Sequence, residues 1–172
     1  MHAEQRAFCE KVKGLLPEFF RDSDVVDFGS LDINGNNRYL FEGGTYVGID
    51  IGPGPNVDVV SRAKDFTPEK PIDVVISTEM LEHDEEWEAS LLQMVNIVRP
   101  GGLVIFTCAT TGRAEHGTVH HSPGDAPFVH EYYRNLTEDD VRNVWDLYNI
   151  FSDFCFETGP PADLRFWGLR KT

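Results

Sequence analysis

Short apolar runs alternate along the chain with segments in which apolar residues recur every three or four positions. The short runs are bounded by glycine, proline or polar turn residues, which is typical of β-strands, and the continuous run at 72–77 suits a strand covered on both faces. The predicted strands span residues 25–28, 45–50, 57–60, 72–77, 103–107, 152–157 and 164–170.

The segments with three- and four-residue spacing predict helices between these strands. The first helix is expected over residues 3–20 and the second over 34–42. A third is expected from Asp84, and a fourth after Thr137, whose side chain is suited to cap it. Residues 108–135 are predicted to be irregular, because they are rich in histidine, glycine and proline.

This alternation predicts an α/β fold, namely a Rossmann-like, doubly wound, mostly parallel seven-stranded sheet. The last two strands lie too close together for a helical crossover, so they are expected to form a C-terminal antiparallel hairpin. Since no linker, charge block or internal repeat divides the chain, residues 1–172 are expected to form a single domain.

The charge and the cysteines narrow the range of partners and compartments. The chain carries 29 acidic residues against 15 lysines and arginines, a formal net charge of −14, which disfavours nucleic acids and anionic membranes as partners. Cys9, Cys108 and Cys155 form no C-x-x-C pair and are expected to be reduced thiols of a cytoplasmic protein. No signal peptide or apolar run of membrane-spanning length is expected, and no pattern indicates an oligomeric state.

The polar turn after the first strand carries the first candidate chemistry. Residues 25–40 read VVDFGSLDINGNNRYL, where a dinucleotide-binding protein would have G-x-G-x-x-G. Gly29 permits a sharp turn, but Leu31 and Asn34 occupy the second and third glycine positions. The second glycine of that motif allows the backbone to approach a pyrophosphate closely. A leucine at this position, Leu31, therefore favours a ligand without phosphates.

The order VVDFGS, YVGID, IDVVISTEMLEH and VRPGGLVIFT resembles the class I methyltransferases that use S-adenosylmethionine. The resemblance is greatest to the small stand-alone type, similar to methyltransferase type 11, and covers residues 25–107. It implies S-adenosylmethionine as the cofactor, which has no phosphate. It also implies a small-molecule or glycan methyl acceptor.

The resemblance assigns roles to two strand-end carboxylates. Asp27 would approach the amino group of the ligand, often through water, or else cap the following turn. Asp50 lies 23 residues later, a separation at which a carboxylate can accept hydrogen bonds from ribose hydroxyls, or it is an ordinary turn aspartate. Ile51 would then lie against the adenine.

Further positions complete the expected cofactor site. The Ala63 amide would reach an adenine ring nitrogen, whereas Arg62 departs from the acid common in the family and would either stack on the ring or point to solvent. Ser77, Thr78 and Glu79 would line the floor near the methionine moiety. The expected cofactor-binding residues are Asp27, Gly29, Ser30, Leu31, Asp50, Ile51, Arg62, Ala63, Ser77 and Thr78.

The segment 112–135 follows the fifth strand and is expected to lie over the methyl donor. It holds four of the six histidines, which could supply a general base, bind a metal ion or simply be polar residues of a lid. Because their spacing lacks a clear tetrahedral partner pair, no metal site is expected; the acidic residues around Glu82-His83 are interpreted as the start of a helix.

The end of this segment, EYYRNLT, resembles the Tyr-Arg-x-x-Thr found late in such methyltransferases. Tyr133 and Arg134 would face the acceptor, although Arg134 would equally suit an ion pair with an acid of the protein. The candidate catalytic residues are His116, His120, His130, Tyr133 and Arg134.

The predicted reaction is an in-line methyl transfer to an acceptor, with a hydroxyl favoured and a histidine as base, and with no metal required. Two alternatives stay open. One is a catalytically inactive S-adenosylmethionine-binding regulatory module. The other is a nucleotide-sugar or nicotinamide enzyme, which Leu31 and Asn34 disfavour.

Overall fold

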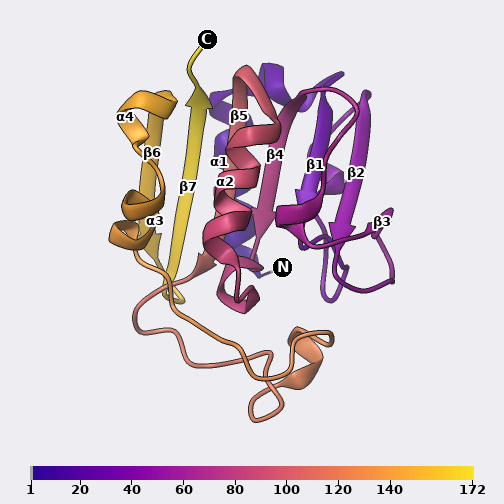
Figure 1. The fold of residues 1–172 in the computed structure, drawn as a ribbon, viewed down its shortest axis with the longest axis vertical. Coiled ribbons are helices and arrows are strands. Elements are labelled where there is room, and N and C mark those ends of the chain that lie inside the picture. Colours follow the sequence, from indigo (N-terminus) through magenta and orange to yellow (C-terminus); the bar gives the residue numbers. More distant parts are fainter. Residues whose placement is uncertain (1) are drawn as a thin grey trace.

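The computed structural model describes residues 2–172 and contains one seven-stranded sheet (Figure 1). The strands are β1 (Asp24–Phe28), β2 (Thr45–Asp50), β3 (Val59–Val60), β4 (Ile72–Thr78), β5 (Val98–Ala109), β6 (Phe151–Gly159) and β7 (Asp163–Arg170). Their order is β3-β2-β1-β4-β5-β7-β6; the first five are parallel, and β7 is antiparallel to both of its neighbours. The predicted mostly parallel sheet with a C-terminal hairpin is therefore confirmed.

Helices cover both faces of the sheet, α1 on one face and α2, α3 and α4 on the other (Figure 1). The helices are α1 (Ala3–Leu15), α2 (Trp87–Ile97), α3 (Glu138–Val144) and α4 (Leu147–Ile150), with 3-10 turns η1 (Pro17–Phe20), η2 (Arg38–Leu40), η3 (Ala63–Asp65), η4 (Leu81–His83) and η5 (Pro123–Asp125). None of the helices in residues 2–172 is long and apolar enough to cross a membrane.

Alternate residues of the central strands feed two hydrophobic cores, because successive side chains of a strand point to opposite faces. In β5, Val104 and Phe106 pack in the core shared with Leu91 of α2, whereas Ile105 packs in the core shared with Val12 of α1. All of these side chains are fully buried. This double burial explains why the central strands read as continuous apolar runs.

The predicted helix over 34–42 is wrong, since the structure has only the short turn η2 there. The two carboxylate oxygens of Asp32 accept hydrogen bonds from the Gly35 amide and the Asn36 side-chain amide, each at 2.7 Å. Gly35 also adopts a φ of 123°, which no helix contains. Side chains that bond the nearby backbone compete with helix formation, and here they hold the segment as a turn.

The first helix is also shorter than predicted, because it ends at Leu15 and residues 17–20 form the separate turn η1. Pro17 has no amide hydrogen to continue the helix, and it disfavours helical geometry in the residue before it. The fourth helix begins as expected, since Thr137 and Asp140 form a reciprocal capping box at the start of α3.

Residues 110–135 lie beyond the carboxyl ends of the parallel strands and contain no regular element except η5 (Figure 1). Both ends of this segment meet at the sheet, where the Leu136 amide donates to the Ala109 carbonyl at 2.9 Å. The Arg134 amide donates to the Glu82 carbonyl, also at 2.9 Å. The segment is therefore fixed at its base beside η4.

Candidate functional site

A cavity of about 820 Å³ lies between the carboxyl ends of β1, β2 and β4 and the overlying segment 110–135. The chain passes from β1 outward to β2 and β3 and then returns to β4 on the other side, so the strand order reverses beside β1. Ligands of open α/β sheets bind at such a reversal. Phe128 closes one side, since its ring lies so near Gly52 that an added Cβ there would come within 2.2 Å of it.

The turn after β1 requires a glycine for two reasons. Gly29 has a φ of 77°, and an added Cβ would come within 2.4 Å of the Met80 Cβ. The amides of Gly29 and Ser30 both donate to the Ile49 carbonyl of β2, at 2.9 and 3.0 Å. The backbone of this turn is therefore held close to the neighbouring strand at the cavity wall.

Asp27 lies at the base of the cavity and is only 1% exposed. Its carboxylate accepts hydrogen bonds from the Tyr46 hydroxyl and from the Asn37 side-chain amide, the latter at 3.2 Å to Oδ2. Burial raises the pKa of Asp27 to about 7. The other end of the Asn37 amide, Oδ1, is buried and has no hydrogen-bond partner within residues 2–172.

Asp50 lines the cavity on the side of β2 and orders the loop opposite it. Its Oδ2 accepts a hydrogen bond from the Leu31 amide at 3.1 Å, and its Oδ1 accepts one from the Gly52 amide at 3.4 Å. Burial raises the pKa of Asp50 above its ordinary value. The structure thus places two carboxylates, Asp27 and Asp50, at opposite sides of the Gly29 turn.

The structure brings most of the other expected cofactor residues to the same cavity, including Ile51, Ala63 and Thr78. Arg62 also lines it, but its guanidinium is paired with Glu86 at 3.0 Å and is largely exposed. Ser77 is the exception, because it is fully buried in β4 and does not line the cavity. Adjacent strand residues point to opposite faces, so Thr78 and Ser77 do not reach the cavity together.

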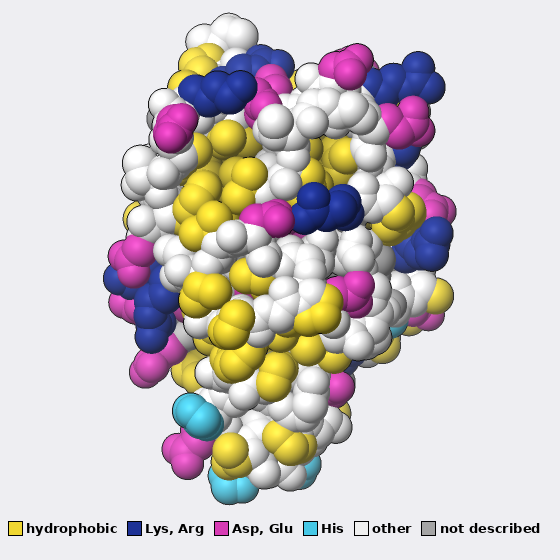
Figure 2. Space-filling model, turned by 90° about the vertical axis from the view of Figure 1, so that its right-hand side faces the viewer, with side chains coloured by type: hydrophobic (Ala, Val, Ile, Leu, Met, Phe, Trp, Pro, Cys, Tyr) yellow, Lys and Arg dark blue, Asp and Glu magenta, His cyan; other side chains and the backbone are white. Residues whose placement is uncertain are grey.

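The histidines of the overlying segment divide into two groups. His116 and His130 line the cavity. His120 and His121 are exposed and do not line it. Figure 2 shows several exposed histidine side chains at the lower end of the molecule. The structure therefore does not bring His120 to the site with the other two candidate bases.

Tyr133 and Arg134 do not line the cavity. The Tyr133 ring lies 5.0 Å from the His116 ring, and its hydroxyl donates to Asn135 at 2.9 Å. Arg134 forms an ion pair with Asp140 at 2.6 Å, which is the second of the two roles expected for it. Its guanidinium therefore does not contribute positive charge to the cavity lining. Tyr133 supports the wall formed by His116.

Asn37 and His2 are among the cavity residues that the sequence did not indicate, whereas Glu79 lines the cavity as expected. Asn37 lies in a segment that was expected to be helical. His2 and Glu79 face each other, with His2 Nε2 3.3 Å from Glu79 Oε2 and 3.1 Å from Asp163 Oδ2. Hydrogen bonds to Asp163 and Glu79 raise the pKa of His2 to about 9. No local motif could have indicated this contact, since it joins three distant parts of the chain.

Comparison with known families identifies the class of the protein. The model of a methyltransferase domain family matches residues 1–149, so the chain belongs to that family. With its seven-stranded sheet, the chain is a class I S-adenosylmethionine-dependent methyltransferase by fold and family. A comparison with curated proteins found no match.

Solved structures share the fold at low sequence identity. A Burkholderia thailandensis 1,6-didemethyltoxoflavin-N1-methyltransferase, solved with 1,6-didemethyltoxoflavin and S-adenosylhomocysteine, superposes with a TM-score of 0.68 at 15% identity, covering 99% of this chain and 79% of its own. Magnesium protoporphyrin IX methyltransferase from Synechocystis, with bound S-adenosylmethionine, gives 0.64 at 13% identity, covering 98% and 80%. The N-methyltransferase NodS from Bradyrhizobium japonicum gives 0.62 at 12% identity, covering 98% and 97%.

Proposed function

We propose that this chain forms one methyltransferase domain that transfers a methyl group from S-adenosylmethionine to a hydroxyl of a neutral small molecule or glycan. The observation that carries the proposal is the pair of buried carboxylates, Asp27 and Asp50, on opposite sides of a tight glycine turn at the strand reversal. The methyl donor carries an ammonium group and a ribose, which these two carboxylates can bind. It has no phosphate, so the position of Leu31 does not need the glycine that a pyrophosphate-binding turn has there.

The residues at the base of the cavity fit the amino acid end of the donor. The unpartnered Asn37 Oδ1 is a buried acceptor whose side chain also contacts Asp27, and a buried acceptor without a donor is costly. An ammonium group would donate to Asn37 and pair with ionised Asp27 in a site largely withdrawn from water. Asp50 would accept from the ribose hydroxyls, and Ile51 and Ala63 would contact the adenine.

The donor supplies a methyl group already activated by a sulfonium sulfur, so the protein chiefly has to align the acceptor and exclude water. The segment 110–135 covers the cavity and provides that exclusion. His116 and His130 are the candidate bases for the hydroxyl proton, because both line the cavity.

The charge of the cavity favours a neutral acceptor. Glu79, Asp84, Glu85 and Glu131 line the cavity, whereas the cations that also line it, His2, Arg62 and Arg113, are each already paired with an acid. The cation Arg134 is engaged with Asp140 outside it. Carboxylate or phosphate acceptors would be repelled by this set of acids. Hydroxyl groups of a sugar or another uncharged molecule would not be.

Isothermal titration calorimetry with S-adenosylmethionine, S-adenosylhomocysteine and NAD tests the ligand class. We expect the first two to bind and NAD not to bind, and binding of NAD alone would overturn the proposal. Transfer of a radiolabelled methyl group to a panel of glycans, phenols and small acids then tests the reaction. Donor binding without transfer to any hydroxyl would instead favour a regulatory binding module.

A further inference from the structure

Glu82, His83 and His116 form a compact cluster beside the acceptor side of the cavity. Glu82 and His83 belong to η4, directly after β4, and His116 comes from the overlying segment. One ligand atom from each of the three side chains lies within 4.8 Å of the others. His83 and His116 also line the cavity, so the cluster opens toward it.

Two buried polar atoms of this cluster lack hydrogen-bond partners within residues 2–172. Glu82 is fully buried; its Oε1 accepts a hydrogen bond from the Ala109 amide at 3.1 Å, whereas its Oε2 has no partner. His83 is 8% exposed, and its Nδ1 has no partner. Leaving such atoms unpaired in the interior is costly, because their desolvation is not compensated. Both residues belong to the cluster, so a cation bound there is a candidate partner for them.

The orientation of His116 suits a metal ligand. Its Nδ1 lies 3.1 Å from the Ala114 carbonyl oxygen, which can only accept, so Nδ1 carries the proton and Nε2 keeps a free lone pair. Metal-binding histidines usually donate their second ring nitrogen to a carbonyl or carboxylate in this way. Spacing along the chain could not have indicated this particular set, because Glu82-His83 and His116 lie far apart in the sequence.

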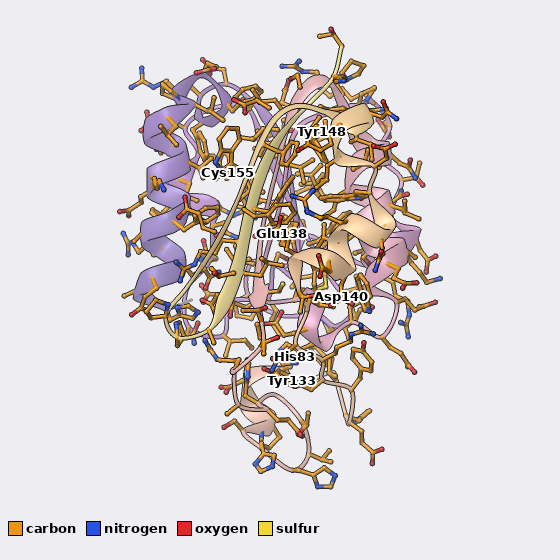
Figure 3. The ribbon with its side chains drawn as sticks, turned by 90° about the vertical axis from the view of Figure 1, so that its left-hand side faces the viewer. His83, Tyr133, Glu138, Asp140, Tyr148 and Cys155 are labelled. Carbon is orange, nitrogen blue, oxygen red and sulfur yellow. The ribbon has the colours of Figure 1, made fainter. Side chains whose placement is uncertain are left out.

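The surrounding residues hold the two imidazoles in place. The His83 and His116 rings lie 5.0 Å apart in an edge-to-face arrangement, and the Tyr133 ring packs against both. Figure 3 shows His83 and Tyr133 close together. An added Cβ at Gly117 would come within 2.6 Å of the His83 ring, so the backbone closes the other side.

A second group, His2, Glu79 and Asp163, has a similar composition but a different balance of charge. Asp163 already pairs with Arg113 at 2.9 Å and with Arg165 at 3.5 Å. Its carboxylate is therefore compensated by cations that would repel a metal ion. This contrast separates an internal ion-pair network from the Glu82 cluster, because Glu82 itself forms no ion pair with an arginine or lysine among residues 2–172.

We propose that Glu82, His83 and His116 bind a divalent transition metal ion whose open coordination positions take a hydroxyl oxygen of the methyl acceptor. Two imidazoles and one carboxylate favour Zn²⁺, Co²⁺ or Mn²⁺ over Mg²⁺, which prefers oxygen ligands. The ion draws electron density from the bound oxygen, so the hydroxyl gives up its proton to water at lower pH. The metal site does not depend on the proposed function, whereas the role of the ion in binding the acceptor rests on the proposed methyl transfer. With a metal bound, His116 would be a ligand and not the base.

The test is a titration of chelator-treated protein with Co²⁺ alone, followed by the visible ligand-field bands of the bound ion and by calorimetry. We expect one equivalent to bind and Zn²⁺ to displace it. His116→Ala should weaken Co²⁺ binding at least about 10-fold, a typical scale for damage to a metal site. The matched controls His120→Ala and His121→Ala remove exposed histidines of the same segment and should leave Co²⁺ affinity unchanged.

Glu82→Gln keeps the shape of the side chain and removes its charge, and it should also abolish the ligand-field bands. If that variant fails to fold, His116→Ala decides alone, because His116 is only partly buried in the overlying segment. Absence of stoichiometric Co²⁺ binding, or equal affinity in His116→Ala and wild type, would overturn the metal site. S-adenosylhomocysteine binding, measured separately without metal, reports on the proposed function, so the two can fail independently.

Discussion

The burial of the Asp27 carboxylate leads to a prediction about how the unfolding free energy depends on pH. Its pKa is raised from 3.8 to about 7, so the folded protein binds this proton more tightly than the unfolded chain does. A shift of this size corresponds to about 4 kcal/mol. The stability contributed by protonated Asp27 is therefore fully present below pH 3.8 and is lost as the pH rises through about 7.

Asp27→Asn keeps the shape of the side chain and removes the titration. The difference in unfolding free energy, wild type minus variant, should fall by about 2.5 kcal/mol between about pH 5 and 7.5. Urea denaturation followed by circular dichroism measures it at each pH. Taking the difference between the two proteins cancels the many other acids of the chain.

Asp24→Asn is the matched control, because Asp24 begins the same strand but its pKa is lowered by an ion pair with Lys70. Its difference curve should stay flat over this pH range, since it titrates below it. If the Asp27→Asn curve were equally flat, the carboxylate would be ionised at no cost, and the reasoning from burial would be refuted.

Ligand binding offers a second readout of the same group. If the donor's ammonium pairs only with ionised Asp27, S-adenosylhomocysteine should bind up to about 20-fold more tightly at pH 7.5 than at pH 5.5, because the ionised fraction grows by that factor. Calorimetry at the two pH values measures this change. A pH dependence retained in Asp27→Asn would assign it to another group.

Three further outcomes are expected. Asp50→Ala should weaken S-adenosylhomocysteine binding in calorimetry by about 1–3 kcal/mol, as for lost charged hydrogen bonds, whereas the exposed control Asp65→Ala should not; equal affinities would remove the ribose assignment. Gly29→Ala should lower the thermal unfolding midpoint and abolish donor binding, because its Cβ would meet Met80 at 2.4 Å, and wild-type behaviour would contradict the argument from the turn. Thr137→Ala should lose about 1 kcal/mol of stability in urea with donor affinity unchanged, and an unchanged stability would show that the capping box contributes little.

Most strands of this protein could be predicted closely, and for the central ones burial on both faces leaves a clear local signal. The strand expected at 45–50 is observed at Thr45–Asp50. The strand expected at 72–77 is observed at Ile72–Thr78, one residue longer than expected. The helix expected over 34–42 does not form. The hydrogen bonds that the Asp32 carboxylate accepts hold the start of this segment as a turn, and the few apolar residues there do not outweigh them. Local sequence patterns identify helices and strands best where no nearby side chain forms competing hydrogen bonds with the backbone.

The candidate site was predictable only where one residue carries the signal. Asp27 and Asp50 could be identified because each follows a strand at the right separation. Their environment could not, since Tyr46 and Asn37 reach Asp27 from another strand and from an irregular turn. The approach of His83 to His116 depends likewise on tertiary folding, and no spacing in the sequence encodes it.

Because the Leu136 amide meets the Ala109 carbonyl, residues 110–135 leave and rejoin the sheet at one place. The entropic cost of loop closure grows only slowly with length, so an insert grafted between these two positions could be longer, shorter or of another composition with little penalty for the scaffold. Transplanting this one piece between proteins of the same architecture, followed by an assay of which acceptors are methylated, is therefore a direct test of whether the segment selects the acceptor.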